Sequence, residues 1–214
     1  MTLVNLSLSR WAIIFHLFIV FLSCNDSSNW INLDKIQVVR TSRDSTYFYG
    51  GNLFSGVIKG FSNNKNEILL FNVNQGKLHG QLREFYTNGD LKIESNYEQG
   101  KLDGKFSEFY SNNKLKESLC YENGLIDGER KSYWSNGVVK QSSFFKSGVL
   151  SGESKFYFSN SQLRKQISFD RNGNRDGIWL DYFSNGNLKQ KIEYESGKIV
   201  DSLKVYNVNG QIVN

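Results

Sequence analysis

The sequence predicts an all-β protein: an elongated, twisted antiparallel sheet of consecutive β-hairpins. Two observations lead to this fold class. A phrase of about 24 residues recurs along the chain, and repeats of this length indicate a modular array. The chain also has 19 glycines and no proline, and 14% of its residues are aromatic, which suits a continuous sheet. The repeat array is expected over residues 56–214, about six and a half repeats, and its anchor glycines are Gly56, Gly80, Gly104, Gly128, Gly152 and Gly177.

Residues 1–23 differ from the rest of the chain and are predicted to form a signal peptide of the lipoprotein type. An apolar run from Trp11 to Leu22 follows Arg10, and it is shorter than the about 20 residues that a spanning helix needs. The run ends at Ser23-Cys24, which resembles the lipobox of bacterial lipoproteins. That resemblance implies lipidation of Cys24 and a lipid anchor in the membrane of the bacterial cell envelope, facing the periplasm or the surface. A plain cleaved signal or an uncleaved anchor is the alternative.

Two short segments separate the signal peptide from the repeats. Residues 24–29 are polar after Cys24 and are expected to be a tether. Residues 30–55 contain the strand-like runs Ile36–Val39 and Thr46–Tyr49. Because an exposed edge strand invites pairing with another chain, we expect residues 30–55 to be an N-terminal cap or entry strands.

Each repeat contains two predicted turns. Asn-Gly pairs such as Asn88-Gly89 lie between strand-like runs and predict type I′ turns with positive φ at both residues. A second turn is expected over Gly100–Gly104, where Asp103 precedes the anchor glycine. A structural role for this Asp is favoured over a catalytic one, because Asp stabilises turns and because His79 occupies the same position in another copy.

The strands alternate in character. In the second strand of the repeat we expect Leu91, Ser95 and Tyr97 on one face and Lys92 and Glu94 on the other. The first strand ends in two consecutive aromatic residues, which must point to opposite faces. One aromatic ladder is therefore expected in the core and the other exposed or covered. The second ladder is the candidate partner-binding surface and consists of Tyr86, Tyr110, Trp134, Phe158 and Phe183.

Basic residues also recur in one register of the repeat and are expected about 10 Å apart. A row of this kind could follow phosphates. Acidic residues such as Glu84 and Glu108 recur as well, which favours cross-strand charge pairing and solubility instead. The candidate basic ladder consists of Lys92, Lys116, Lys140, Arg164 and Lys189.

Composition gives little support to catalysis, and we expect no enzyme. After removal of the signal peptide the chain keeps 25 basic and 21 acidic residues, an interspersed balance that predicts no nucleic-acid binding. His79 would be the remaining histidine, and Cys120 occupies a position that varies among the copies. No Cys/His metal spacing and no nucleotide-binding glycine loop is present, so no metal and no cofactor is expected.

The repeated phrase, aromatic–aromatic–x–Asn–Gly–x–Leu–Lys followed by an aromatic and Gly–x–x–x–Gly, resembles a known family. Over residues 47–214 it is similar to the MORN-variant repeats of bacteria, including the YwqK-type "antitoxin" proteins. The resemblance implies consecutive hairpins in a curved, elongated sheet, commonly on exported lipoproteins. It transfers no catalytic residues.

Three functions remain open from the sequence. The first is a non-catalytic scaffold or protein-binding module anchored to the bacterial envelope, since repeat sheets present long regular surfaces. The alternative is an antitoxin or immunity protein that neutralises a partner toxin. The second alternative is a surface that binds phosphate or lipid headgroups. The partner itself is unknown.

Overall fold

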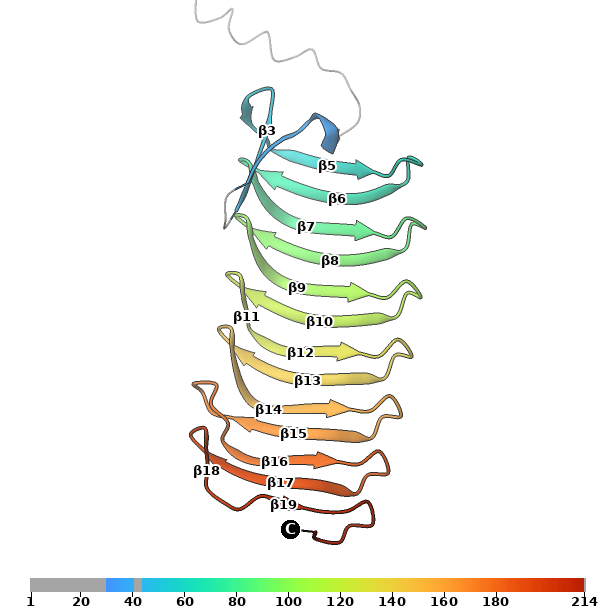
Figure 1. Ribbon diagram of the computed structural model, residues 1–214. Helices are drawn as coiled ribbons and strands as arrows, with labels where there is room; N and C mark the ends of the chain where they lie inside the picture. Colours follow the sequence, from blue (N-terminus) through green and yellow to red (C-terminus); the bar gives the residue numbers. More distant parts are fainter. Residues whose placement is uncertain (1–29, 41–43, 214) are drawn as a thin grey trace, which may run out of the picture.

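The computed structural model describes residues 30–40 and 44–213. Their strands form a 16-stranded sheet and a small three-stranded one, and consecutive hairpins stack along the long axis of the molecule (Figure 1). The fold class predicted from the repeat is confirmed. The signal peptide, Cys24 and the tether lie outside the described residues. None of the helical structure within the described ranges is long and apolar enough to cross a membrane.

Each repeat contributes two antiparallel strands to the long sheet, and its first strand pairs with the last strand of the repeat before it. The parallel pairing of β1 with β5 departs from this rule. The long sheet consists of β1 (Trp30–Asn32), β5 (Gly56–Phe61), β6 (Glu67–Asn74), β7 (Lys77–Phe85), β8 (Leu91–Glu98), β9 (Lys101–Phe109), β10 (Leu115–Glu122), β11 (Leu125–Ile126), β12 (Gly128–Tyr133), β13 (Val139–Lys146), β14 (Val149–Tyr157), β15 (Leu163–Phe169), β16 (Gly177–Tyr182), β17 (Leu188–Glu195), β18 (Lys198–Ile199) and β19 (Lys204–Val205).

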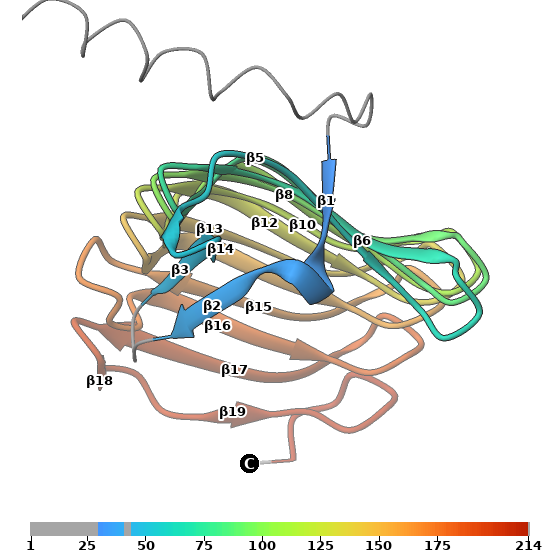
Figure 2. The same cartoon turned by 90° about the horizontal axis from the view of Figure 1, so that it is seen from above.

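The small sheet lies before the repeats and packs against one side of the long sheet, below β5 and β6 in Figure 2. It consists of β2 (Gln37–Arg40), β3 (Ser45–Tyr49) and β4 (Asn52–Leu53), and a short 3-10 helix, η1 (Leu33–Lys35), precedes it. We call the side of the long sheet that carries this small sheet the inner face, and the opposite side the outer face.

The Asn-Gly turns do not have the type I′ geometry that the sequence predicts. In the turn after β7, Gly89 has a positive φ of 91°, whereas Asn88 does not. The Gly89 N–H donates to the Tyr86 carbonyl at 2.9 Å, and the Tyr86 N–H donates to the Asp90 carbonyl at 2.8 Å. These bonds define a type I turn followed by one left-handed residue. Asn is favoured because its Oδ1 accepts from the Asp90 N–H at 3.1 Å.

The type I′ turns lie at the other end of the repeat. Gln99 and Gly100 have φ values of 48° and 84°, and the residues on either side of them are paired directly. The same geometry recurs at Gln75-Gly76, Asn123-Gly124, Ser147-Gly148 and Ser196-Gly197. The second turn expected over Gly100–Gly104 is therefore shorter than predicted. Gly104 lies inside β9 with a φ of 94°, next to an irregularity in its pairing with β8.

A β-bulge in each hairpin changes which side chains share a face. Phe85 is opposite Leu91, but the residue before it, Glu84, is opposite Ile93. Lys92 is therefore the extra residue of the bulge. Because directly opposite residues share a face, Leu91 and Ile93 lie on different faces of the sheet.

This bulge corrects the predicted face assignment. Ser95 and Tyr97 share the inner face, as expected, but Leu91 lies on the outer face with the first aromatic of the repeat. Lys92 and Glu94, which were expected on one face, do not share a face either. Lys92 pairs with an inner-face carboxylate, whereas Glu94 lies opposite Arg83 on the outer face. Period-two alternation therefore holds in the interior of the strand and is interrupted at the bulge.

The core lies where the small sheet covers the inner face. Ile58 and Phe71 are almost completely buried there, and Leu33, Ile36 and Tyr47 from the N-terminal segment pack against them. The Tyr47 N–H donates to the carbonyl of Gly76 at 2.9 Å, which fixes the small sheet to a type I′ turn. Among the described residues this packing is limited to the first repeats, so the inner face of the later repeats has no second layer above it.

Candidate functional site

Most of the repeated polar side chains bind the next repeat. In the Asn-Gly turns, Nδ2 of Asn112 donates to the carbonyl oxygen of Ser135 at 3.0 Å. Asn136 makes the same bond to Ser159 at 3.0 Å. The side chain thus satisfies its own turn through Oδ1 and a neighbouring turn through Nδ2. Equivalent bonds are made by Asn66, Asn160 and Asn185.

The Asp residues before the anchor glycines have a similar role near the turns at the opposite ends of the strands. Asp127 accepts a hydrogen bond from the Ser147 N–H at 2.9 Å, one repeat further on, and pairs with Lys146 at 3.0 Å. These bonds lower the pKa of the Asp127 carboxyl, the backbone bond being the larger cause. Asp103 and Asp176 accept the corresponding bonds from Asn123 and Ser196. The Asp in these positions holds a type I′ turn of the next repeat.

The second aromatic ladder also connects repeats. The hydroxyl of Tyr86 donates to the carbonyl oxygen of Phe109 at 2.7 Å, and Tyr110 makes the same bond to Tyr133 at 2.7 Å. Trp134 donates from Nε1 to Tyr157 at 3.3 Å. Phe158 and Phe183 hold the same position without a donor. All five rings are half-buried, as are those of the first ladder, so neither ladder is simply core or simply exposed.

The basic ladder lies on the second aromatic ladder. The Nζ atom of Lys140 is 4.8 Å from the ring centroid of Trp134, and the Nζ of Lys189 is 5.8 Å from that of Phe183. Lys92 and Lys116 lie 6.0 Å from the rings of Tyr86 and Tyr110. Arg164 differs, because its guanidinium lies over Phe156, at 5.9 Å. We call these two ladders together the aromatic–basic strip.

The charge pairing of the strip changes along the sheet. Lys92 pairs with Glu84 at 2.5 Å and Lys116 pairs with Glu108 at 2.7 Å. The hydrogen bonds that both lysines donate to these carboxylates raise the pKa of the lysines. The acidic residue is replaced by Ser132 in the next copy.

The C-terminal part of the strip is therefore free of internal partners. In the copy after Ser132, Phe156 holds the acidic position, and in the last copy Asp181 lies 3.5 Å from Lys165 instead. Lys140, Arg164 and Lys189 are exposed and have no carboxylate within ion-pair distance among the described residues. The expected charge pairing holds for the first two cations of the ladder and is wrong for these three.

A hollow of about 380 Å³ lies at the transition between the paired and the unpaired cations. Arg130 lies in it and binds Glu117 through Nε at 2.7 Å and Nη2 at 2.6 Å. Sequence reasoning missed Arg130, although the copies carry Phe106 and Trp179 in its register. The sequence signal that could have identified Arg130 is a charged residue at a position where those copies have an aromatic one. The hollow is lined by Glu108, Tyr110, Lys116, Glu117, Arg130, Ser132, Tyr133, Lys140 and Gln141.

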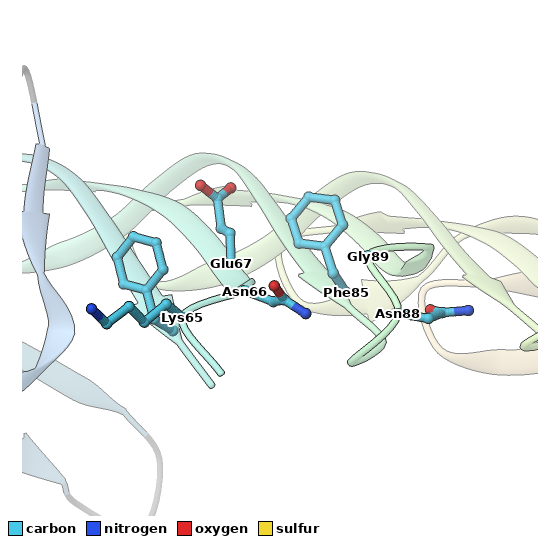
Figure 3. A pocket seen from close by; sticks show the side chains of 7 residues that line it. Lys65, Asn66, Glu67, Phe85, Asn88 and Gly89 are labelled. Atoms are coloured by element: carbon cyan, nitrogen blue, oxygen red, sulfur yellow. The ribbon is translucent and has the colours of Figure 1, made fainter. Parts of the chain in front are cut away.

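The outer face has hollows of a different character. One of about 480 Å³ lies between the turns after β5 and β7, where Glu67 and Phe85 come from neighbouring repeats (Figure 3). Another of about 550 Å³ lies over β12–β14. Its lining includes Glu129 and Lys131, which pair with each other, and Lys155, which pairs with Glu153. Charges on the outer face are thus largely paired with each other.

Comparison with protein families assigns the repeats. The family described as "MORN repeat variant" matches residues 78–99, 102–123, 126–147, 150–173 and 175–200. These ranges together are more than half of the chain. The chain belongs to the MORN repeat variant family. The family match supports a repeat scaffold or binding module, a type of protein that is generally not catalytic.

Other comparisons add little to the MORN repeat assignment. No curated protein matches the chain. Among solved structures, the crystal structure of a GtfA/B complex bound to UDP and GlcNAc is similar over 64% of this chain, with 11% identity and a TM-score of 0.22. The chain spans 24% of that protein's length, and the low TM-score supports no argument.

No group of three or more potential metal-ligating side chains lies within the described part of this MORN repeat protein. In that part, Nδ1 of His79 lies 3.3 Å from Glu98, and Cys120 is an exposed free thiol on the outer face. The structure therefore brings the two predicted ladders together into one strip and gives the repeated Asp and Asn residues partners in neighbouring repeats.

Proposed function

We propose that this protein is a non-catalytic scaffold that binds a partner protein through the inner face of its later MORN repeats, and that a lipid on Cys24 anchors it to the bacterial envelope. The observation that carries the proposal is an apolar row without a covering layer. Beyond the small sheet, β9 to β17 carry half-buried aromatic side chains on the inner face. No other element of the described residues packs above them. Contiguous apolar surface of this kind marks interaction sites.

The inner face differs from the outer face in a way that suits a partner. Phe106, Tyr121 and Phe145 lie on the inner side of β9, β10 and β13. Trp179 stacks on Tyr194 with ring centroids 5.7 Å apart. Ion pairs lie on both faces, such as Lys131 with Glu129 on the outer face and Lys116 with Glu108 on the inner face, but the row of rings belongs to the inner face. A partner would bury these rings and leave the outer face in solvent.

Adjacent residues on opposite faces allow a matched test of this proposal. Phe144 lies opposite Glu129 on the outer face and is 45% exposed, whereas Phe145 lies opposite Gly128 on the inner face. We expect Phe145→Ala combined with Tyr121→Ala to abolish capture of a cross-linked partner from envelope extracts, and Phe144→Ala to leave it unchanged. Circular dichroism confirms folding. Equal loss of capture in both proteins, or in neither, contradicts the proposed face.

The lipid anchor is tested separately. Fatty-acid labelling should require Cys24, disappear in Cys24→Ala, and be sensitive to globomycin, the inhibitor of lipoprotein signal cleavage. An unlabelled soluble protein would disprove the anchor. If the captured partner proves to be a toxin, the scaffold acts as an immunity protein, and an anchor outside the cytoplasm would let it meet an incoming toxin.

A further inference from the structure

We propose that the unpaired end of the aromatic–basic strip, formed by Lys140, Arg164 and Lys189, binds an extended acidic segment of the partner protein. The inference rests on the proposed function and names the chemistry of the segment that lies on the inner face. Its basis is the change in pairing along one structural position: the same register that holds ion pairs in two repeats holds exposed cations in the next three.

The loss of the internal carboxylates has a direct electrostatic consequence. A carboxylate 2.5 Å from Lys92 already neutralises that cation, so an external anion gains little there. At Lys140, Ser132 replaces the carboxylate, and at Arg164 the ring of Phe156 does so. At Lys189 the position keeps a carboxylate, Asp181, which lies 3.5 Å from Lys165 instead. The positive field of the strip is thus concentrated over the last three repeats, where a partner of opposite charge is favoured.

The aromatic rings hold these cations in place without neutralising them. The ring of Trp134 lies 4.8 Å from the Lys140 ammonium, and the ring of Phe183 lies 5.8 Å from that of Lys189. Cation–π contacts of this kind restrict a long side chain and leave its other hydrogen-bond donors available. Less conformational freedom is then lost when an anion binds.

The spacing of the cations fits a polypeptide. One repeat adds two strands, so successive cations are about 10 Å apart along the sheet. A polyproline II segment advances about 3.1 Å per residue with three residues per turn, and acidic side chains at every third position would face the strip at about 9 Å intervals. The chain would run along the long axis of the sheet, across the strands.

The hollow at the start of the unpaired region gives the segment an end point. Lys140 and Gln141 line it beside Tyr110, and Arg130 is fixed there by Glu117. An acidic side chain entering this hollow would meet the Lys140 ammonium with an aromatic wall beside it. The cations further toward the N-terminus carry their own carboxylates, so the binding segment ends here.

A flat membrane surface fits this strip less well. The small sheet of β2, β3 and β4 stands on the same inner face over the first repeats (Figure 2). It would hold a planar bilayer away from part of that face, whereas a polypeptide segment can follow the strip beside it. We therefore favour an acidic polypeptide over a lipid headgroup surface.

The experiment measures binding of a fluorescent peptide of about ten residues, with Glu at every third position and Pro between, to the whole purified chain. We expect saturable binding that weakens with salt. The triple variant Lys140→Gln, Arg164→Gln, Lys189→Gln should bind about tenfold more weakly. The matched control Lys105→Gln, Arg171→Gln, Lys198→Gln removes the same charge from exposed residues outside the strip and should retain the affinity.

Each other outcome overturns the inference. Equal weakening in both triple variants would show an effect of net charge alone. Absence of peptide binding, with strip-dependent binding of phosphatidylglycerol vesicles, would make the strip a headgroup surface. If the partner captured through Phe145 is unaffected by the strip variant, the proposed function stands and the acidic segment is rejected.

Discussion

The hydroxyl of Tyr110 donates a hydrogen bond of 2.7 Å to the carbonyl oxygen of Tyr133. Tyr133 is the residue before Trp134, which is the counterpart of Tyr110 in the next repeat. This bond crosses from one hairpin to the next outside the β-ladder. Together with the Asn and Asp side chains at the two ends of the strands, this bond connects neighbouring repeats. In a repeat protein, stability depends on such contacts between neighbours.

Removing this hydroxyl should weaken the array. Tyr110→Phe keeps the half-buried ring but leaves the Tyr133 carbonyl without that donor, so we expect a loss of about 1 kcal/mol in the free energy of unfolding. Urea denaturation followed by fluorescence measures it. The reciprocal control is Phe158→Tyr, which adds a hydroxyl at the same position of a later repeat and should stabilise. Unchanged midpoints in both variants would show that the bond contributes nothing.

One Asn-Gly turn has a residue that does not suit its backbone. Ser161 has a φ of 71° at the position that is Gly137 in the preceding repeat. A left-handed conformation is unfavourable for a residue with a Cβ atom, so Ser161→Gly should stabilise by about 0.5–1 kcal/mol after the entropy of the unfolded chain is included. Gly137→Ser should destabilise by a similar amount. Thermal unfolding compares them, and a lower midpoint for Ser161→Gly would contradict this account.

The sequence was sufficient to predict the sheet because its information is periodic. The recurrence of glycines from Gly80 to Gly177 and of paired aromatics placed two strands in each repeat, and the structure has them. The type I′ turn was assigned to the wrong end, because Asn88-Gly89 is the stronger local signal than Gln99-Gly100. The side chain of Asn88 acts through its amide oxygen, which a rule based on φ alone does not include.

The candidate site was only partly predictable, for a different reason. The bulge at Lys92 depends on the pairing of two strands, and strict alternation places this side chain on the wrong face. The separation into paired and unpaired cations follows from single substitutions such as Ser132, whose effect appears only when the strands are in register. Periodicity identifies what the repeats share, whereas this strip differs between repeats.

The Asp residues that cross between repeats should make stability depend on pH. The pKa of Asp127 in the folded protein is below its ordinary value of 3.8, mainly because the Ser147 N–H donates to it and also because of Lys146. The ionised Asp127 carboxylate therefore contributes its full stabilisation of the folded state above about pH 4. This contribution is lost as the pH falls through the pKa of the folded protein. Asp127→Asn should lower the unfolding midpoint at neutral pH and flatten its acid dependence.

The control for this pH dependence is Glu195→Gln. Glu195 is an exposed carboxylate with no ion pair in the described part of the chain. Its removal should leave the acid limb of the stability curve unchanged. Parallel curves for the wild type and Asp127→Asn would mean that the bond to Ser147 does not perturb the carboxyl.

The single thiol of the described chain reports the register of β10, because neighbouring residues of a strand lie on opposite faces. Cys120 is exposed opposite Lys105 on the outer face, whereas its neighbour Leu119 is 4% exposed on the inner face. In a Cys24→Ser background, Cys120 should react with a maleimide as fast as an accessible thiol does. Leu119→Cys, with Cys120→Ser, should react at least about tenfold more slowly, because reaction there requires local opening. The reverse order of rates would mean that β10 is shifted by one residue, since such a shift moves every side chain of a strand to the other face.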